Sequence, residues 1–190
     1  MPKKPLPFLF TLLIFCIGRG IKAQEINLSK NYLGLIPSVL VEPYDTINAV
    51  EVNFLPFLYE FRIGNNNDLG IQFRPILNYR FYEVQPGFSQ IGATLAVNKY
   101  FLNAFKDTSW LKPQLGGYFT YAYNRLDKIQ TMTLGVEPGA YMRFPNNISI
   151  SINVQPGINY YPDAASRDFV GTTSGFKGHF GIIVHAGYNF

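Results

Sequence analysis

An alternation of apolar and polar residues with a period of two runs through most of the chain. In the last fifteen residues, Phe180, Ile182 and Val184 fall on one parity, whereas His179 and His185 fall on the other. Because successive side chains of a β-strand point to opposite faces, this period predicts a strand with one apolar and one polar face.

The same pattern recurs along the chain in segments separated by turn-forming residues. The predicted strands are 32–41, 47–63, 69–82, 91–101, 111–124, 131–144, 148–159 and 176–190. In the second segment the apolar parity changes at Leu55-Pro56, which predicts a β-bulge with one extra residue, since Pro is tolerated where a ladder bond is already lost. An all-β fold follows, an eight-stranded antiparallel up-and-down transmembrane β-barrel.

Residues 1–23 have the three parts of a secretory signal peptide. Lys3 and Lys4 precede an apolar run over 6–17, and the segment from Gly18 to Ala23 follows, with cleavage expected after Ala23. We therefore expect residues 24–190 to form the mature barrel. The single cysteine, Cys16, lies inside the signal, and Phe15 before it is too large for a lipoprotein cleavage site, so we expect no lipid anchor and no disulfide.

The excess of basic over acidic residues comes from the predicted signal peptide. Four of the sixteen Lys and Arg residues lie in it, whereas all twelve Asp and Glu residues follow it. The mature net charge is 12 − 12 = 0, so no nucleic-acid partner is expected.

The composition of the polar face indicates which face is outside. It consists mostly of Gly, Ser, Thr, Asn and Gln, which suits a packed lumen, whereas a soluble barrel would be dense in Lys and Glu. The apolar face carries aromatic residues near strand ends, as interfacial girdles do. We expect insertion in a Gram-negative outer membrane, in contact with lipid and lipopolysaccharide, with both termini in the periplasm. A soluble lipocalin-like barrel is the alternative.

A barrel of this size has a lumen that side chains fill, so inward charges need partners. Counting register back from the turns sets Glu51 opposite Arg80, brings Glu60 within diagonal reach of Arg74, and sets Glu137 beside Gln155. The predicted lumen network also contains Arg143, Lys112, His179 and His185. We expect it to plug the barrel; a narrow channel for ions or small solutes is the alternative.

The two histidines give little support to catalysis or metal binding. His179 and His185 lie roughly 20 Å apart along a strand, too far to bind one metal. Ser166, Asp168 and Ser174 in the last loop could approach a histidine, which keeps a lipid A-modifying enzyme as a further alternative. We expect no enzyme activity, no cofactor and no metal.

The alternating strands and the terminal Tyr188-Asn189-Phe190 resemble the small eight-stranded outer-membrane proteins of the A and X type, within the porin-like superfamily. In that resemblance Tyr188 and Phe190 are the aromatic residues of the signal read by the barrel-assembly machinery. The group is variously structural, adhesive or lipid-modifying, so the resemblance implies architecture rather than activity. We expect a structural role in the envelope, or interaction with another membrane protein.

Overall fold

The computed structural model describes residues 28–36, 39–44, 47–81, 86–102, 104, 111–163, 167, 171 and 174–190, with the backbone alone for 39–44, 47–51 and 145. The predicted signal peptide lies outside these ranges. The strands are β1 (Asn31–Leu35), β2 (Val39–Tyr44), β3 (Ile47–Asn53), β4 (Phe57–Ile63), β5 (Leu69–Phe81), β6 (Gly87–Tyr100), β7 (Leu111–Asn124), β8 (Ile129–Arg143), β9 (Ile148–Tyr160) and β10 (Phe176–Asn189).

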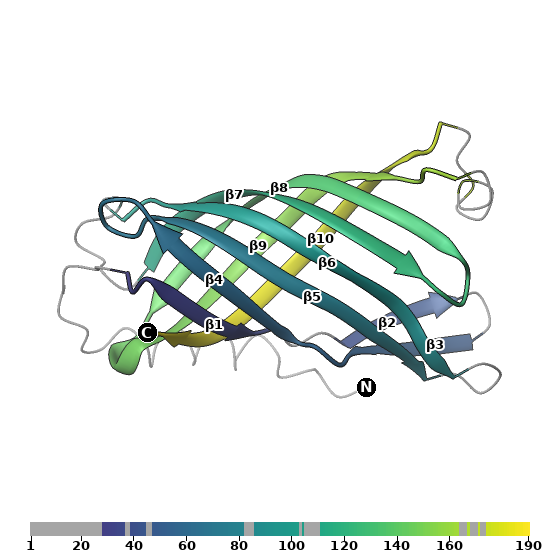
Figure 1. The fold of residues 1–190 in the computed structure, drawn as a ribbon, viewed down its shortest axis with the longest axis horizontal. Coiled ribbons are helices and arrows are strands. Elements are labelled where there is room, and N and C mark those ends of the chain that lie inside the picture. The colour runs from purple at the N-terminus through teal and green to yellow at the C-terminus, as the bar shows by residue number, and fades with distance from the viewer. Residues whose placement is uncertain are drawn as a thin grey trace, which may run out of the picture.

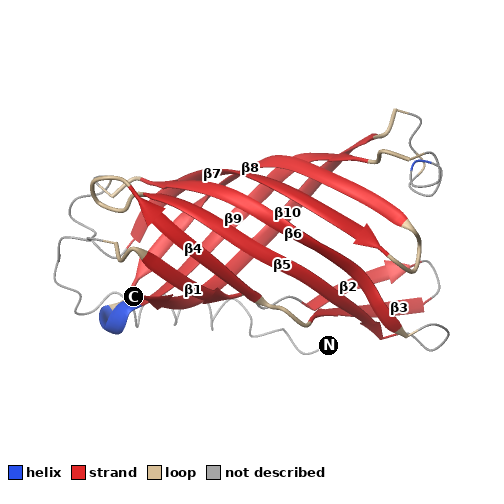
Figure 2. Ribbon diagram, in the orientation of Figure 1, coloured by secondary structure: helices blue, strands red, loops and turns tan. Residues whose placement is uncertain are grey.

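These strands form a closed barrel (Figures 1 and 2). Every pairing is antiparallel, and the ring runs β5-β4-β1-β10-β9-β8-β7-β6 and back to β5. The ring has eight positions, because β2 and β3 continue the first and second positions beyond β1 and β4. The predicted eight-stranded antiparallel up-and-down barrel is confirmed as a fold.

The second position of the ring contains the predicted bulge. Leu35 pairs with Phe57, and Val39 pairs with Val52. Residues 36–38 lie between these pairs on one strand and residues 53–56 on the other, so the second strand has one extra residue. The backbone N–H of Ile36 donates to Pro56 across this region at 2.7 Å. The predicted first strand over 32–41, whose exact extent the sequence left open, corresponds to β1 and β2, and residues 37–38 between them lie outside the described ranges.

A second bulge explains why the start of β6 was misplaced. The structure begins β6 at Gly87, four positions before the predicted Ile91, and its register with β5 shifts between Asn78 and Tyr79. Phe88 and Ile91 are both exposed although they differ in parity, and Ser89 between them is buried. The extra residue interrupts the alternation, so the sequence pattern hid this part of the strand.

The barrel has two distinct ends (Figure 1). The C-terminus, the Gly64–Asp68 turn and the short 3-10 turn η1 (Pro145–Asn147) lie at one end, which we call the terminal end. Asn146 and Asn147 have φ values of 68° and 62°, a left-handed conformation that Asn tolerates better than most residues, and this permits the tight turn. The opposite end, which holds the 125–128 turn and the long connection before β10, is the loop end.

The two faces of the sheet are inverted relative to a water-soluble barrel. On β5, Ile71 and Phe73 are 44% exposed on the outside, whereas Gln72 and Arg74 are 0% and 3% exposed in the lumen. The same division holds around the ring, with large apolar side chains outside and polar side chains within. The interior of the barrel is therefore a packed polar core.

Glycines allow β1 and β10 to approach closely where the ring closes. A Cβ added at Gly187 would lie 2.1 Å from the Leu33 carbonyl oxygen, which is backbone and cannot move aside. We expect Gly187→Ala to destabilise the barrel by about 1–3 kcal/mol, the usual cost of overpacking. Gly178→Ala on the same strand is the control, because nothing lies within 4 Å of a Cβ there. Urea unfolding followed by circular dichroism measures both; equal midpoints would contradict close packing at Gly187.

Candidate functional site: the lumen network

Charged side chains from three strands meet inside the lumen. Glu60 and Arg62 lie on β4, Arg74 lies on β5 and Glu137 lies on β8. All four are at most 3% exposed. Removing such charges from water is costly unless each has a partner and its remaining polar atoms are hydrogen-bonded.

Glu60 accepts hydrogen bonds from three donors. Arg62 donates through Nε and Gln72 through Nε2, and the Tyr100 hydroxyl donates at 2.6 Å. Hydrogen bonds to an ionised carboxylate are stronger than those between neutral groups. These three donors offset the cost of burying the Glu60 carboxyl group.

Arg62 lies in a cage of three tyrosine rings. Its guanidinium carbon is 5.3, 5.2 and 5.3 Å from the ring centroids of Tyr32, Tyr100 and Tyr141. The cation is attracted to the negative faces of the rings, and the attraction is greater where water is excluded. Arg62 Nη1 also donates to Asn189 Oδ1 at 2.6 Å, which connects β4 to the last strand.

Arg74 and Glu137 form a second centre across the lumen. Arg74 Nη1 donates to Glu137 Oε2 at 2.8 Å, and Nη2 donates to Oε1 at 2.6 Å. This two-bond geometry is the strongest way to pair these groups. Asn153 Nδ2 and Gln155 Nε2 also donate to Glu137, at 2.9 and 2.7 Å.

Gln72 joins the two centres through the two ends of its amide. Its Nε2 donates to Glu60, while its Oε1 accepts from Arg74 Nε at 3.0 Å and also from Nη2. A continuous set of hydrogen bonds therefore crosses the lumen from Asn189 to Gln155. This set, made by Glu60, Arg62, Gln72, Arg74, Glu137 and their partners, is the central plug.

The register predictions hold, but one ion pair differs. Glu137 lies beside Gln155 as predicted, and Glu51 is opposite Arg80 in the backbone register of β3 and β5. Glu60 is opposite Gln72, which places it diagonal to Arg74 as expected. Glu60 and Arg74 are each hydrogen-bonded to Gln72. Arg74 forms its ion pair with Glu137 and not with Glu60.

Three cations predicted for the network have partners at the ends of the barrel. Lys112 Nζ donates to the Ala104 carbonyl at 2.9 Å, and Arg143 Nη2 donates to Asn147 Oδ1 at 2.9 Å, both at the terminal end. Arg80 lies 3.3 Å from Asp127 toward the loop end. Residues at or near the turns therefore provide acceptors for these three cations.

The histidines occupy separate places on β10. His185 is buried, and its Nδ1 lies 3.0 Å from the Tyr32 hydroxyl, while the half-buried His179 lies edge-on to Tyr118 with centroids 6.3 Å apart. Within the described part of the chain, no three His, Cys, Asp or Glu side chains are grouped to hold a metal ion. Ser166 and Asp168 lie outside the described residues. The Ser174 hydroxyl accepts from the Phe176 N–H at 3.3 Å.

Sequence reasoning missed several members of the plug. Arg62 shares the parity of Glu60 two residues earlier, so alternation alone could have placed it in the lumen. The same parity places Tyr141 and Asn189 on the polar face. It could not show that they meet around Arg62, because the cage residues and Asn189 come from β1, β6, β8 and β10 and come together only when the ring closes.

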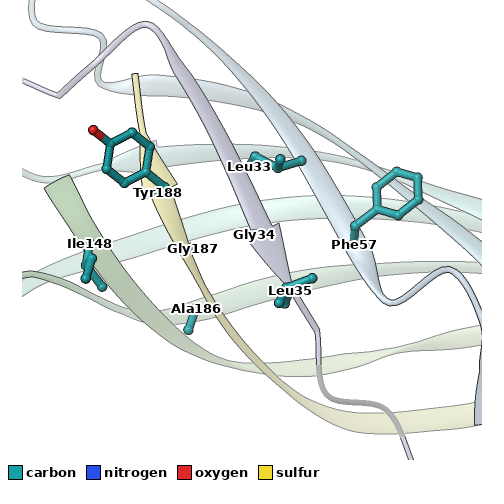
Figure 3. Close-up of a pocket in the computed structure, with 8 residues that line it drawn as sticks. All are labelled: Leu33, Gly34, Leu35, Phe57, Ile148, Ala186, Gly187 and Tyr188. Carbon is teal, nitrogen blue, oxygen red and sulfur yellow. The ribbon is translucent and has the colours of Figure 1, made fainter.

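The outside of the ring closure has a shallow apolar groove (Figure 3). It is lined mainly by Leu33 and Leu35 on β1, Phe57 on β4, and Ile148, Ala186 and Tyr188. Ala186 is the smallest outward side chain among these neighbours, which leaves the depression. Tyr188 and Phe190, predicted to belong to an assembly signal, are 51% and 57% exposed on this outer face.

Comparison with known proteins adds no assignment. Neither a protein-family model nor a curated protein sequence matches the chain. Within the described residues, no helix combines the length and apolar character needed to cross a bilayer.

The Arg74–Glu137 pair predicts a large effect of removing one charge. Glu137→Gln leaves Arg74 buried without its counter-charge, so we expect a loss of about 3–5 kcal/mol in the free energy of unfolding. Asp68→Asn is the matched control, because its partner Lys99 is 47% exposed and such surface pairs contribute about 1 kcal/mol or less. Equal losses in urea titrations would show that the lumen pair is solvated.

The tyrosine cage predicts separate contributions from ring and hydroxyl. Tyr141→Phe keeps the ring and loses a 3.1 Å hydrogen bond to Asn189, at a cost of about 1 kcal/mol. Tyr141→Leu also removes the ring from Arg62, and we expect it to cost about 2 kcal/mol more, through the cavity and the lost cation–π contact. Thermal and urea unfolding of both variants measure this; identical stabilities would mean that the ring contributes nothing to holding the cation.

Proposed function

We propose that the protein is an integral outer-membrane barrel that is closed to solutes and has a structural or interaction role in the envelope. The observation that carries this proposal is the inverted arrangement of the two faces. Leu95, Leu134 and Phe180 are 55–69% exposed outside, whereas Glu60 and Glu137 are fully buried within. An apolar surface around a whole barrel is unfavourable in water and suits hydrocarbon.

The even number of ring positions supports the proposed orientation. The described chain begins and ends at the terminal end (Figure 1). In bacterial barrels with an even number of strands, both chain ends face the periplasm. We therefore assign the terminal end to the periplasm and the loop end to the cell exterior, where lipopolysaccharide surrounds it. Tyr188 and Phe190 are proposed as contacts for the barrel-assembly machinery.

The central plug supports a closed barrel over a narrow channel. Its charges are hydrogen-bonded to each other, and Gln72 connects them across the lumen. An ion passing through would have to displace a paired, desolvated Arg74 or Glu137. Strengthening the wall from inside is the role that this arrangement supports best.

Membrane insertion is tested by gel mobility. We expect the protein in membrane fractions, extracted only by detergent, with different mobility in unboiled and boiled samples, because a closed barrel resists the detergent until it is heated. A protein recovered in the soluble periplasm without a mobility shift would favour the lipocalin-like alternative and refute the proposal.

Closure of the lumen is tested by conductance in planar bilayers. We expect the wild-type barrel to be silent, and the triple variant Gln72→Ala, Arg74→Ala, Glu137→Ala to conduct ions because the plug is removed. Ile71→Ala with Phe73→Ala on the outward face of the same strand is the control and should stay silent. If the wild type conducts ions as well as the triple variant does, the narrow channel is supported instead.

A further inference from the structure

The apolar groove on the outside of the ring closure follows the seam between β1 and β10. Gly34 and Gly187 are paired across this seam and line the groove with backbone alone, since glycine has no side chain. Figure 3 shows the short Ala186 side chain between the larger side chains of Leu35 and Ile148. Small residues on both strands therefore leave a depression in an outer face that is otherwise covered by bulky side chains.

The register of β1 places this groove within one leaflet of a bilayer. Leu35 is opposite Ala186, and Leu33, which is nearer the terminal end, is opposite Tyr188. Leu35 is four residues from Asn31 at the start of β1, roughly 13 Å along the strand. At the tilt of about 40° usual in membrane barrels, this is a depth of about 10 Å, less than the half-thickness of about 15 Å of the hydrocarbon core. The groove therefore lies at the depth of acyl chains.

A lysine lies on the outer face, on the terminal-end side of the groove. Lys30 directly precedes β1 and is exposed, and its Nζ is 5.2 Å from the centroid of the outward Phe61 ring on β4. The next residue, Asn31, accepts a 2.8 Å hydrogen bond from the Tyr59 hydroxyl on the same face. Polar groups thus follow the apolar groove toward the terminal end, in the order in which a headgroup follows an acyl chain.

The charge of Lys30 is available to a ligand. In the part of the chain that the structure describes, no salt bridge involves Lys30. Lys99, which is also exposed at the terminal end, is instead paired with Asp68 at 2.6 Å. A lysine without a carboxylate partner at a membrane surface attracts the phosphate groups of lipids.

We propose that the groove and Lys30 form a binding site for a single phospholipid of the periplasmic leaflet. An acyl chain lies in the groove, and the headgroup phosphate lies beside the Lys30 ammonium. The site favours a headgroup of net negative charge, because a zwitterionic headgroup carries an ammonium of its own, which Lys30 repels. This inference rests on the membrane function proposed above.

Native mass spectrometry tests the headgroup preference on the mature barrel in detergent. Phosphatidylglycerol and phosphatidylethanolamine with the same acyl chains are added in equal amounts. We expect the wild type to retain a single lipid, with phosphatidylglycerol favoured about fivefold, the factor that one lysine at a membrane surface contributes. Lys30→Gln should remove this preference. Lys99→Gln is the matched control and should keep it, because Asp68 already neutralises Lys99.

Filling the groove tests the place of the acyl chain. Ala186→Leu extends an outward side chain into the groove, so the strand pairing is kept, and we expect most of the retained lipid to be lost. Ala93→Leu makes the same change on β6, where Ala93 lies between Pro75 and Tyr121 and does not line the groove. This control should retain lipid as the wild type does.

Three results would overturn the site. Wild-type retention of lipid by Ala186→Leu would mean that lipid adheres to the outer surface in general. Equal retention of the two headgroups by the wild type would refute the role of Lys30. A wild-type dimer that Ala186→Leu abolishes would mean that a second copy fills the groove.

Gel mobility of the same preparations separates this inference from the proposed function. A barrel that shifts mobility between unboiled and boiled samples but retains no lipid would refute the lipid site alone. A wild-type protein without a mobility shift would refute the membrane function, and the lipid site with it.

Discussion

The pairing of four buried charges is the constraint on which the rest of the barrel depends. Glu60, Arg62, Arg74 and Glu137 are at most 3% exposed. Arg74 has its counter-charge on another strand, and Glu60 and Arg62, which pair within β4, also need hydrogen-bonding partners from other strands. The ring must therefore close with a register that brings β4, β5 and β8 together. Gln72 makes the requirement stricter, because one amide serves both centres and so links their positions.

The outer face and the lumen both require the same orientation of each strand. Large apolar residues cover the outside and would be favourable in lipid, while the lumen holds polar groups that lipid could not solvate. A strand that rotated by one residue would move both sets to the wrong environment at once. This double requirement explains why the two bulges matter. Each absorbs one extra residue, at Phe54–Pro56 or at Ser89, so that apolar side chains stay on the outside on both sides of it.

The sequence predicted the residues that lie opposite each other on neighbouring strands. It missed the contacts that form across the lumen only when the whole ring has closed. Alternation identified the eight ring positions, and counting from tight turns set Glu51 opposite Arg80 and Glu137 beside Gln155. The partner of Arg74 and the cage around Arg62 come from across the lumen, where the contacts depend on barrel diameter and stagger. The early start of β6 was missed because the extra residue at Ser89 interrupts the alternation that marks a strand. The end of β1 at Leu35 had no signal, because the alternation of the first segment continues past it.

The sequence separation of the plug partners has a consequence for biogenesis. Arg74 binds a residue 63 positions later, and Arg62 binds Asn189, 127 positions later and next to the last residue of the chain. An incomplete barrel holds unneutralised charges, and the final strand supplies the last acceptor for Arg62. Burial of the lumen is therefore delayed until the whole chain is present, which makes assembly cooperative and leaves partly made chains without a stable place in the wall.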